Sequence, residues 1–150
     1  MRAIEFRGKV IDEGRQTNEW IFGGLVQQTR NDKFNFIIIP NNQDSFDKLW
    51  IDYGTLGYLD SPVDILAEYV NPNTIGQYIG LNDKNGNKIF EGDFVQYDNK
   101  DVGYVGYANG AFYIKAENIT NEWIPQNLVV IGNIHDNPEL EKRINNNVLG

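Results

Sequence analysis

The sequence predicts a mainly β protein, and three observations support that class. Short runs rich in β-branched and aromatic residues recur along the chain, separated by clusters of Asn, Gly and Asp. Tight-turn dipeptides such as Asn109-Gly110 lie between pairs of these runs. The 150 residues are 41% hydrophobic and 13% aromatic, which is enough to build a core for one domain or two small ones. Helix is expected only in minor amounts.

The N-terminal part is expected to contain three strands, at residues 2–10, 20–28 and 33–40. An exposed connection that contains Gly14 joins the first two. In the third strand Phe34, Phe36 and Ile38 alternate with other residues, which places both aromatic rings on one face. The turn at residues 29–32 would let the third strand pair with the second as a hairpin. These strands predict an N-terminal β meander.

The middle of the chain has weaker signals. Residues 41–61 mix polar and aromatic residues without sustained alternation, so we expect a long ordered loop that can include one helical turn. Residues 62–69 fit either a short strand or a short helix, because periodicity does not separate the two in so brief a run. Asn71-Pro72-Asn73 favours an extended or turn conformation. We place the boundary there, which divides the chain into residues 1–73 and 74–150.

Two Asn-Gly dipeptides predict hairpins in the second part, since the two-residue turn needs positive φ at both central residues. Asn85-Gly86 should reverse the chain between residues 78–82 and 88–90. Asn109-Gly110 should do so between residues 102–108 and 111–115. In the second hairpin, one face should carry the side chains of Val105, Tyr107, Phe112 and Ile114.

The rest of the second part predicts two strands and a helix. Glu91-Gly92-Asp93 should bend the chain before a strand at residues 94–97, with the aspartate bonding nearby backbone amides. Residues 128–134 form the next expected strand. Asn137 as N-cap and Pro138 at the first helical position predict a short C-terminal helix that ends near residue 145. The apolar stripe of Leu140 and Ile144 should dock that helix on the sheet or on a neighbouring subunit.

Charge and composition exclude several classes of protein. The net charge of −8 and the pI near 4.5 disfavour binding to nucleic acid or to an acidic membrane. The basic residues form two mild clusters, both interrupted by acids and expected on the solvated surface: Arg2, Arg7, Lys9 and Arg15, then Lys142 and Arg143. Zero cysteines exclude disulfides and thiolate sites. With no secretory or membrane-spanning pattern, we expect a cytoplasmic protein that does not bind membranes.

The sequence offers no set of residues for catalysis or for a cofactor. His135 is the only histidine, and the serines are just Ser45 and Ser61, so a catalytic triad or a histidine metal site is not expected. The run from Asp83 to Asn87 suggests a calcium loop, but that register puts Lys88 where the glycine belongs. No phosphate-binding glycine loop occurs. We therefore expect no catalytic, cofactor-binding or metal-binding residues.

Two weaker candidates were weighed against structural roles. Glu91 and Asp93 form a pair of acids that could do acid–base work, but solvation of both is the simpler interpretation. Five aromatic residues could form a stacking platform for single-stranded nucleic acid: Tyr104, Tyr107, Phe112, Tyr113 and Trp123. Only Lys115 lies among them as a basic residue, which favours core packing or an oligomer interface.

Five blocks, in this order along almost the whole chain, carry a family resemblance: residues 4–9 (IEFRGK), 20–25 (WIFGGL), 74–86 (TIGQYIGLNDKNG), 89–95 (IFEGDFV) and 130–140 (VIGNIHDNPEL). The sequence resembles the YopX family of small phage and prophage proteins. The resemblance implies a phage or prophage origin, a C-terminal half similar to a small SH3-like β-barrel, and self-association into a homo-oligomer. It implies no catalytic residues, because no biochemical activity is established for the family.

The sequence therefore predicts an accessory protein that acts by binding. We expect a homo-oligomer that presents a rigid β surface to another protein of the phage or its bacterial host, and we do not expect an enzyme. The alternative is a nucleic-acid-associated module in phage replication or regulation, which rests only on the analogy with small β-barrels that bind nucleic acid.

Overall fold

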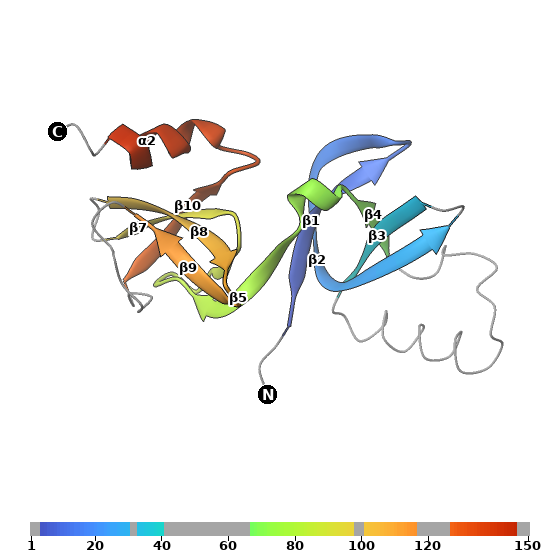
Figure 1. Ribbon diagram of the computed structural model, residues 1–150, viewed down its shortest axis with the longest axis horizontal. Coiled ribbons are helices and arrows are strands. Elements are labelled where there is room, and N and C mark those ends of the chain that lie inside the picture. The colour runs from blue at the N-terminus through green and yellow to red at the C-terminus, as the bar shows by residue number, and fades with distance from the viewer. Residues whose placement is uncertain (1–3, 31–32, 41–66, 98–100, 117–126, 147–150) are drawn as a thin grey trace. The chain divides into compact units, whose positions relative to one another are not determined.

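The computed structural model describes residues 4–30, 33–40, 67–97, 101–116 and 127–146, and its fold is mainly β with a short C-terminal helix (Figure 1). The chain divides into an N-terminal unit that ends at Ile75 and a C-terminal unit that begins at Gly76. This division lies close to the boundary expected after Asn73. The predicted loop at residues 41–61 lies outside the described residues, as does Trp123.

Four strands build the N-terminal unit: β1 (Phe6–Asp12), β2 (Arg15–Arg30), β3 (Lys33–Pro40) and β4 (Glu68–Val70). Successive strands pair antiparallel, which confirms the predicted meander and the hairpin of β2 with β3. The short strand β4 pairs with β3 and also with β1, so that each of the four strands has two neighbours. Glu68–Val70 therefore resolves, for the described part of residues 62–69, the choice between strand and helix in favour of a strand.

The long strand β2 changes partner at a glycine. Its first half pairs with β1 and its second half with β3, and Gly23 lies opposite both Phe6 and Pro40. A Cβ atom at Gly23 would overlap the backbone carbonyl of Ile39, so only glycine allows the strands to approach this closely. The small core inside this ring includes Val10, Ile38 and Val70, all buried.

The connection between β1 and β2 is tighter than expected. Asp12 pairs with Arg15, which leaves a two-residue turn in which Glu13 and Gly14 have φ of 46° and 75°. The sequence suggested only an exposed connection here, because glutamate rarely takes positive φ. Both strands therefore reach closer to the turn than predicted: β1 ends at Asp12 and β2 begins at Arg15.

The C-terminal unit contains β5 (Gly76–Asn82), β6 (Lys88–Phe90), β7 (Asp93–Tyr97), β8 (Asp101–Ala108), β9 (Ala111–Lys115), β10 (Leu128–Asn133) and α2 (Glu141–Asn146). β7 to β10 form an antiparallel sheet in the order β10-β7-β8-β9. β5 and β6 form a hairpin. The SH3-like closure implied by the resemblance stays a prediction, because among the described residues this hairpin does not pair as a strand with the four-stranded sheet.

The four-stranded sheet buries apolar side chains on both faces. On one face, Val95, Val105 and Leu128 pack with Ile79 and Ile89 of the β5–β6 hairpin. The cluster on the other face comprises Phe94, Val102 and Ile144, with Leu140 packed against it. Figure 1 shows α2 lying along this sheet. The predicted docking of the helix through Leu140 and Ile144 is confirmed.

The two Asn-Gly dipeptides behave differently. Asn109 and Gly110 have φ of 52° and 79° between paired Ala108 and Ala111, which confirms the predicted two-residue hairpin. The Asn85-Gly86 prediction is wrong in its turn type, because only Gly86 has positive φ. Asn82 pairs with Lys88 there, so the hairpin closes with a five-residue loop, residues 83–87.

The helix start also differs from the prediction. Pro138–Leu140 form a 3₁₀ turn before α2, and the side chain of Asn137 makes no capping hydrogen bond. Its Oδ1 instead accepts a hydrogen bond from the backbone N–H of Asn133, at 3.3 Å. The side chain of Asn137 thus stabilises the turn after β10 and does not cap the N-terminus of the helix. None of the described helices is both long and apolar enough to cross a membrane.

Candidate functional site

The two acids Glu91 and Asp93 do not form a solvated pair. Asp93 is only 1% exposed, and its Oδ2 accepts a hydrogen bond of 2.8 Å from the backbone N–H of Phe90. This bond holds the bend at Gly92, whose φ is 92°, as the sequence predicted. Glu91 is half-buried, and burial raises its pKa. The expectation that both acids are solvated is wrong, because the bend turns Asp93 into the protein.

The carboxylate of Asp83, which would be the first residue of the rejected calcium loop, has a structural role. Its Oδ1 accepts hydrogen bonds from the backbone N–H groups of Asn85 and Asn87, at 2.9 and 2.8 Å. Its Oδ2 accepts one from the N–H of Val130, at 3.0 Å, which ties the loop to β10. Burial acts to raise the pKa of Asp83, but these hydrogen bonds outweigh it and lower that pKa. The carboxylate is thus already committed to the fold.

Metal binding and histidine chemistry find no support in the part of the chain that the structure describes. No three His, Asp or Glu side chains come together there as metal ligands would. His135 is half-buried in the turn after β10, and its backbone N–H donates to Oδ1 of Asn133 at 3.0 Å.

Two residues of the N-terminal basic cluster are buried. Lys9 is 3% exposed and Arg7 is also buried, so the expectation that they are solvated is wrong. Both cations lie over the ring of Trp20, with Cζ of Arg7 at 4.8 Å and Nζ of Lys9 at 5.4 Å from its centroid. Alternation along β1 and β2 places all three side chains on one face of the hairpin. The two positive charges therefore make cation–π interactions with Trp20 inside the protein.

The aromatic residues of the β8–β9 hairpin divide between its two faces. Tyr107 and Phe112 lie opposite each other in edge-to-face contact at 5.1 Å, and Phe112 packs against the core. Tyr104 and Tyr113 lie on the other face, where Tyr104 packs against Phe94. Because the rings are split in this way, they do not form one stacking platform. Tyr107 is 53% exposed and remains available as a contact.

A hollow of about 280 Å³ lies between this second face and α2. Its lining comprises Tyr104, Tyr113, Lys115, Ile134, Glu141 and Ile144. Burial, together with the charges of Glu91, Tyr113 and Glu141, raises the pKa of Tyr104. A raised pKa keeps this phenol neutral at physiological pH and makes it a poor base or nucleophile. Tyr104 is therefore not activated as a base or nucleophile in this hollow.

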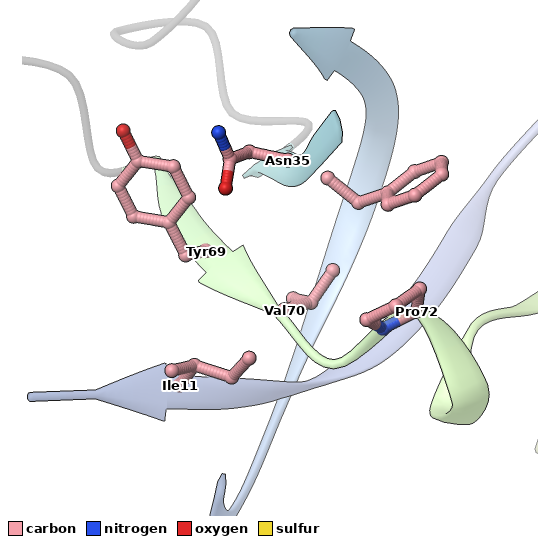
Figure 2. Close-up of a pocket in the computed structure, with 6 residues that line it drawn as sticks. Ile11, Asn35, Tyr69, Val70 and Pro72 are labelled. Atoms are coloured by element: carbon pink, nitrogen blue, oxygen red, sulfur yellow. The ribbon is translucent and has the colours of Figure 1, made fainter. Parts of the chain in front are cut away.

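A second and larger pocket lies in the N-terminal unit, where β4 ends (Figure 2). Its volume is about 320 Å³, and the described residues that line it are Ile11, Asn35, Phe36, Tyr69, Val70 and Pro72. β4 has only three residues, and the chain leaves the sheet at Pro72, so β1 and β3 are not bridged by a strand beyond Val70. In the view of Figure 2, Tyr69 and Asn35 lie on one side of the pocket and Pro72 on the other.

The wall formed by Pro72 is held by the backbone of Lys9. The carbonyl of Lys9 accepts a hydrogen bond of 2.9 Å from the N–H of Asn71, and its N–H donates to Oγ1 of buried Thr74 at 2.8 Å. Asn71 Oδ1 also accepts from the N–H of Asn73, at 3.0 Å, which closes the 3₁₀ turn Pro72–Thr74. Hydrogen bonds thus join the Pro72 wall to β1, although the pocket residues come from three separate segments.

Two of the described residues that line the pocket, Asn35 and Tyr69, carry polar groups. Within the described part of the chain, neither the amide of Asn35 nor the hydroxyl of Tyr69 makes a hydrogen bond. Tyr69 is 42% exposed, whereas Val70 beside it is buried. A surface that joins apolar walls to a few free polar groups is typical of a binding site.

Comparison with known proteins places the chain in a family. The family model described as YopX protein matches residues 5–142. The chain belongs to the YopX family. A search of curated proteins found no match. The YopX-family chain is similar to a solved structure, protein EF1440 from Enterococcus faecalis, at 23% identity and a TM-score of 0.43, over 93% of this chain and 99% of that chain.

None of the pocket residues of this YopX-family chain was singled out as a site from the sequence. Phe36 appears there only as a strand residue and Pro72 only as a boundary signal, whereas Ile11 and Val70 lie one residue beyond the expected ranges 2–10 and 62–69. The useful signal would have been the short β run that ends directly before Asn71-Pro72. A strand that stops at a proline leaves a gap between the two strands on either side of it.

Proposed function

We propose that this YopX-family protein is a binding module that recognises another protein through the pocket of its N-terminal unit. The observation that carries the proposal is a pocket of about 320 Å³ with apolar walls, two polar groups that make no hydrogen bond to another described residue, and a half-exposed tyrosine. Tyrosine is enriched at the centres of protein interfaces because it combines a large apolar ring with a hydrogen-bonding group.

Binding accounts for the described residues better than catalysis does. The buried acids Asp83 and Asp93 accept backbone hydrogen bonds, and the pKa of Tyr104 is raised away from neutrality. An active site would need convergent groups with pKa values near the working pH. The protein is therefore proposed not to be an enzyme.

The proposal includes self-association. Among the described residues of the C-terminal unit, three large apolar or aromatic side chains are exposed by 40% or more, namely Leu81, Tyr107 and Tyr113. Because Tyr107 and Tyr113 lie on opposite faces of the β8–β9 hairpin, we propose that the more exposed Tyr107 contributes to an interface between copies of the chain. The proposed setting is the cytoplasm of a bacterial host that carries the phage or prophage. Nucleic acid is not favoured as the partner, because the net charge is −8 and Arg7 and Lys9 are buried.

A pull-down with the tagged full-length chain tests the proposal. The lysate comes from a prophage-induced or phage-infected host, and the experiment is run with and without nuclease. We expect a protein partner that stays bound after nuclease treatment. Recovery of nucleic acid, with every co-purified protein lost on nuclease treatment, would contradict the proposal and support a nucleic-acid-associated module.

A further inference from the structure

We infer that the pocket of the N-terminal unit takes an extended, proline-containing peptide segment of the partner, with a basic residue beside the prolines. This inference rests on the proposed function and names the chemistry of the partner. It is carried by three properties of the pocket: the shape of its walls, its free donors and the charge around its rim.

The walls suit pyrrolidine rings and small aliphatic side chains. The rings of Phe36, Tyr69 and Pro72 surround the opening, and the aliphatic side chains of Ile11 and Val70 complete the lining. Proline-rich segments adopt the polyproline II conformation before binding, and they dock in grooves lined by aromatic residues with little loss of conformational entropy. A volume of about 320 Å³ is near the lower limit for ligand pockets and fits a few side chains rather than a large cofactor.

The free polar groups match the backbone of such a segment. The carboxamide of Asn35 and the hydroxyl of Tyr69 are both hydrogen-bond donors, and neither makes a hydrogen bond to another described residue. A polyproline II segment has no internal hydrogen bonds, and its carbonyl groups point outward as acceptors. Two donors at the rim of an apolar pocket can therefore bind carbonyls while the side chains between them enter the pocket.

The charge around the pocket favours a basic neighbour. Asp12 follows Ile11, Glu13 lies in the adjoining turn, and Glu68 precedes Tyr69; all three acids are exposed. Among the described side chains next to these acids, Arg15, which pairs with Asp12 across the turn, is the exposed cation. Within this described set, three acids against one arginine give a negative potential near Ile11 and Tyr69, which attracts an arginine or lysine of a peptide and repels a phosphate backbone.

Isothermal titration of the full-length protein with three synthetic peptides of about eight residues tests the inference. The first peptide has an arginine beside two proline pairs and a leucine, the second has glutamate in place of arginine, and the third has alanine in place of every proline. We expect the first to bind, the second to bind severalfold more weakly, and the third not to bind measurably. Equal binding of the first and third peptides would overturn the inference, as would no binding of any peptide.

Three variants locate the binding. Tyr69→Ala and Asn35→Ala should each weaken binding of the arginine–proline peptide by about tenfold. Tyr107→Ala removes an exposed aromatic ring from the C-terminal unit and should leave binding unchanged. Melting temperatures establish that each variant folds. If Tyr69→Ala does not fold, the Asn35→Ala variant still tests the pocket. Unchanged affinity of both pocket variants would overturn the inference, because the peptide would then bind elsewhere. Loss of self-association with unchanged peptide binding would overturn it as well, because the pocket would then serve contact between copies of the chain.

The outcome separates this inference from the proposed function. If no peptide binds but capture of a partner protein still depends on Tyr69, the peptide class is wrong and the binding module stands. If capture does not depend on Tyr69 either, the pocket is not the binding site and the proposed function fails with it.

Discussion

Single residues of this protein combine charge with backbone geometry, and Asp83 is the clearest case. Its carboxylate accepts hydrogen bonds from three backbone N–H groups, of Asn85, Asn87 and Val130. The sequence indicated a turn at this place but not its anchor, because the bond to Val130 joins residues 47 positions apart. Local patterns predict local hydrogen bonds, and a long-range acceptor of this kind depends on the tertiary fold.

Replacing Asp83 with Asn tests that role. Asn keeps the shape but removes the charge, and its NH₂ group would face a backbone donor, so we expect the free energy of unfolding at neutral pH to fall by about 2 kcal/mol. Because the pKa of Asp83 is lowered from 3.8, its contribution is present above pH 3.8 and is lost as the pH falls below that value.

Urea unfolding of both proteins between neutral pH and pH 3 measures the effect, with exposed Asp12→Asn as the control. The difference between wild type and Asp83→Asn should shrink at the acid end of the series. A difference that stays constant with pH would mean that the charge of Asp83 does not stabilise the fold.

The backbone conformation of Gly110 gives a second prediction at the residue scale. A Cβ at this position would meet no atom within 4 Å, so a substitution costs only the strain of φ at 79°. Gly110→Val should lower the free energy of unfolding by about 1–3 kcal/mol, and Gly110→Asn by less, because Asn tolerates positive φ. Thermal melting measures both, and equal melting temperatures for wild type and Gly110→Val would refute the hairpin geometry.

At the scale of elements, the sequence predicted strand order better than turn type. Asn109-Gly110 forms the predicted hairpin, with positive φ at both residues. Asn85-Gly86 does not, because Asp83 captures the backbone of the loop and widens it to residues 83–87. Glu13-Gly14 forms a tight turn without the usual asparagine, since pairing of β1 with β2 imposes it. Strand pairing and side-chain bonds thus overrode the local turn preference.

Two adjacent glycines of β2 offer a matched test of how the N-terminal ring closes. Gly23→Ala should destabilise strongly, by about 2–4 kcal/mol, because the new Cβ would overlap the carbonyl of Ile39. Gly24→Ala should change stability little, since a Cβ there meets nothing within 4 Å. Both variants are compared by chemical unfolding. Equal effects of the two substitutions would show that β2 does not bend at Gly23 as described.

At the scale of the whole molecule, composition predicted the class of protein but not its binding site. The fold class and the YopX family follow from short β runs, turn residues and ordered motifs. The pocket does not, because its lining brings together Ile11, residues 35–36 and residues 69–72, and none of these forms a motif. Only the pairing of β4 with both β1 and β3 brings them together.

Self-association is a prediction of the same scale. Light scattering coupled to size-exclusion chromatography should give a mass that is a multiple of the 17.2 kDa chain, and Tyr107→Ser should shift the distribution toward the monomer. Tyr69→Ser serves as the control with an exposed tyrosine in the other unit. A monomer at every workable concentration would remove the homo-oligomer from the proposed function.

The most direct test of the binding module is capture of the partner by variants of the full-length protein. Wild type, Tyr69→Ala and Tyr107→Ala are used side by side on nuclease-treated lysate, after their melting temperatures have been matched. The account predicts that wild type and Tyr107→Ala retain the same protein partner and that Tyr69→Ala loses most of it. Equal capture by Tyr69→Ala would contradict the assignment of the N-terminal pocket as the binding site.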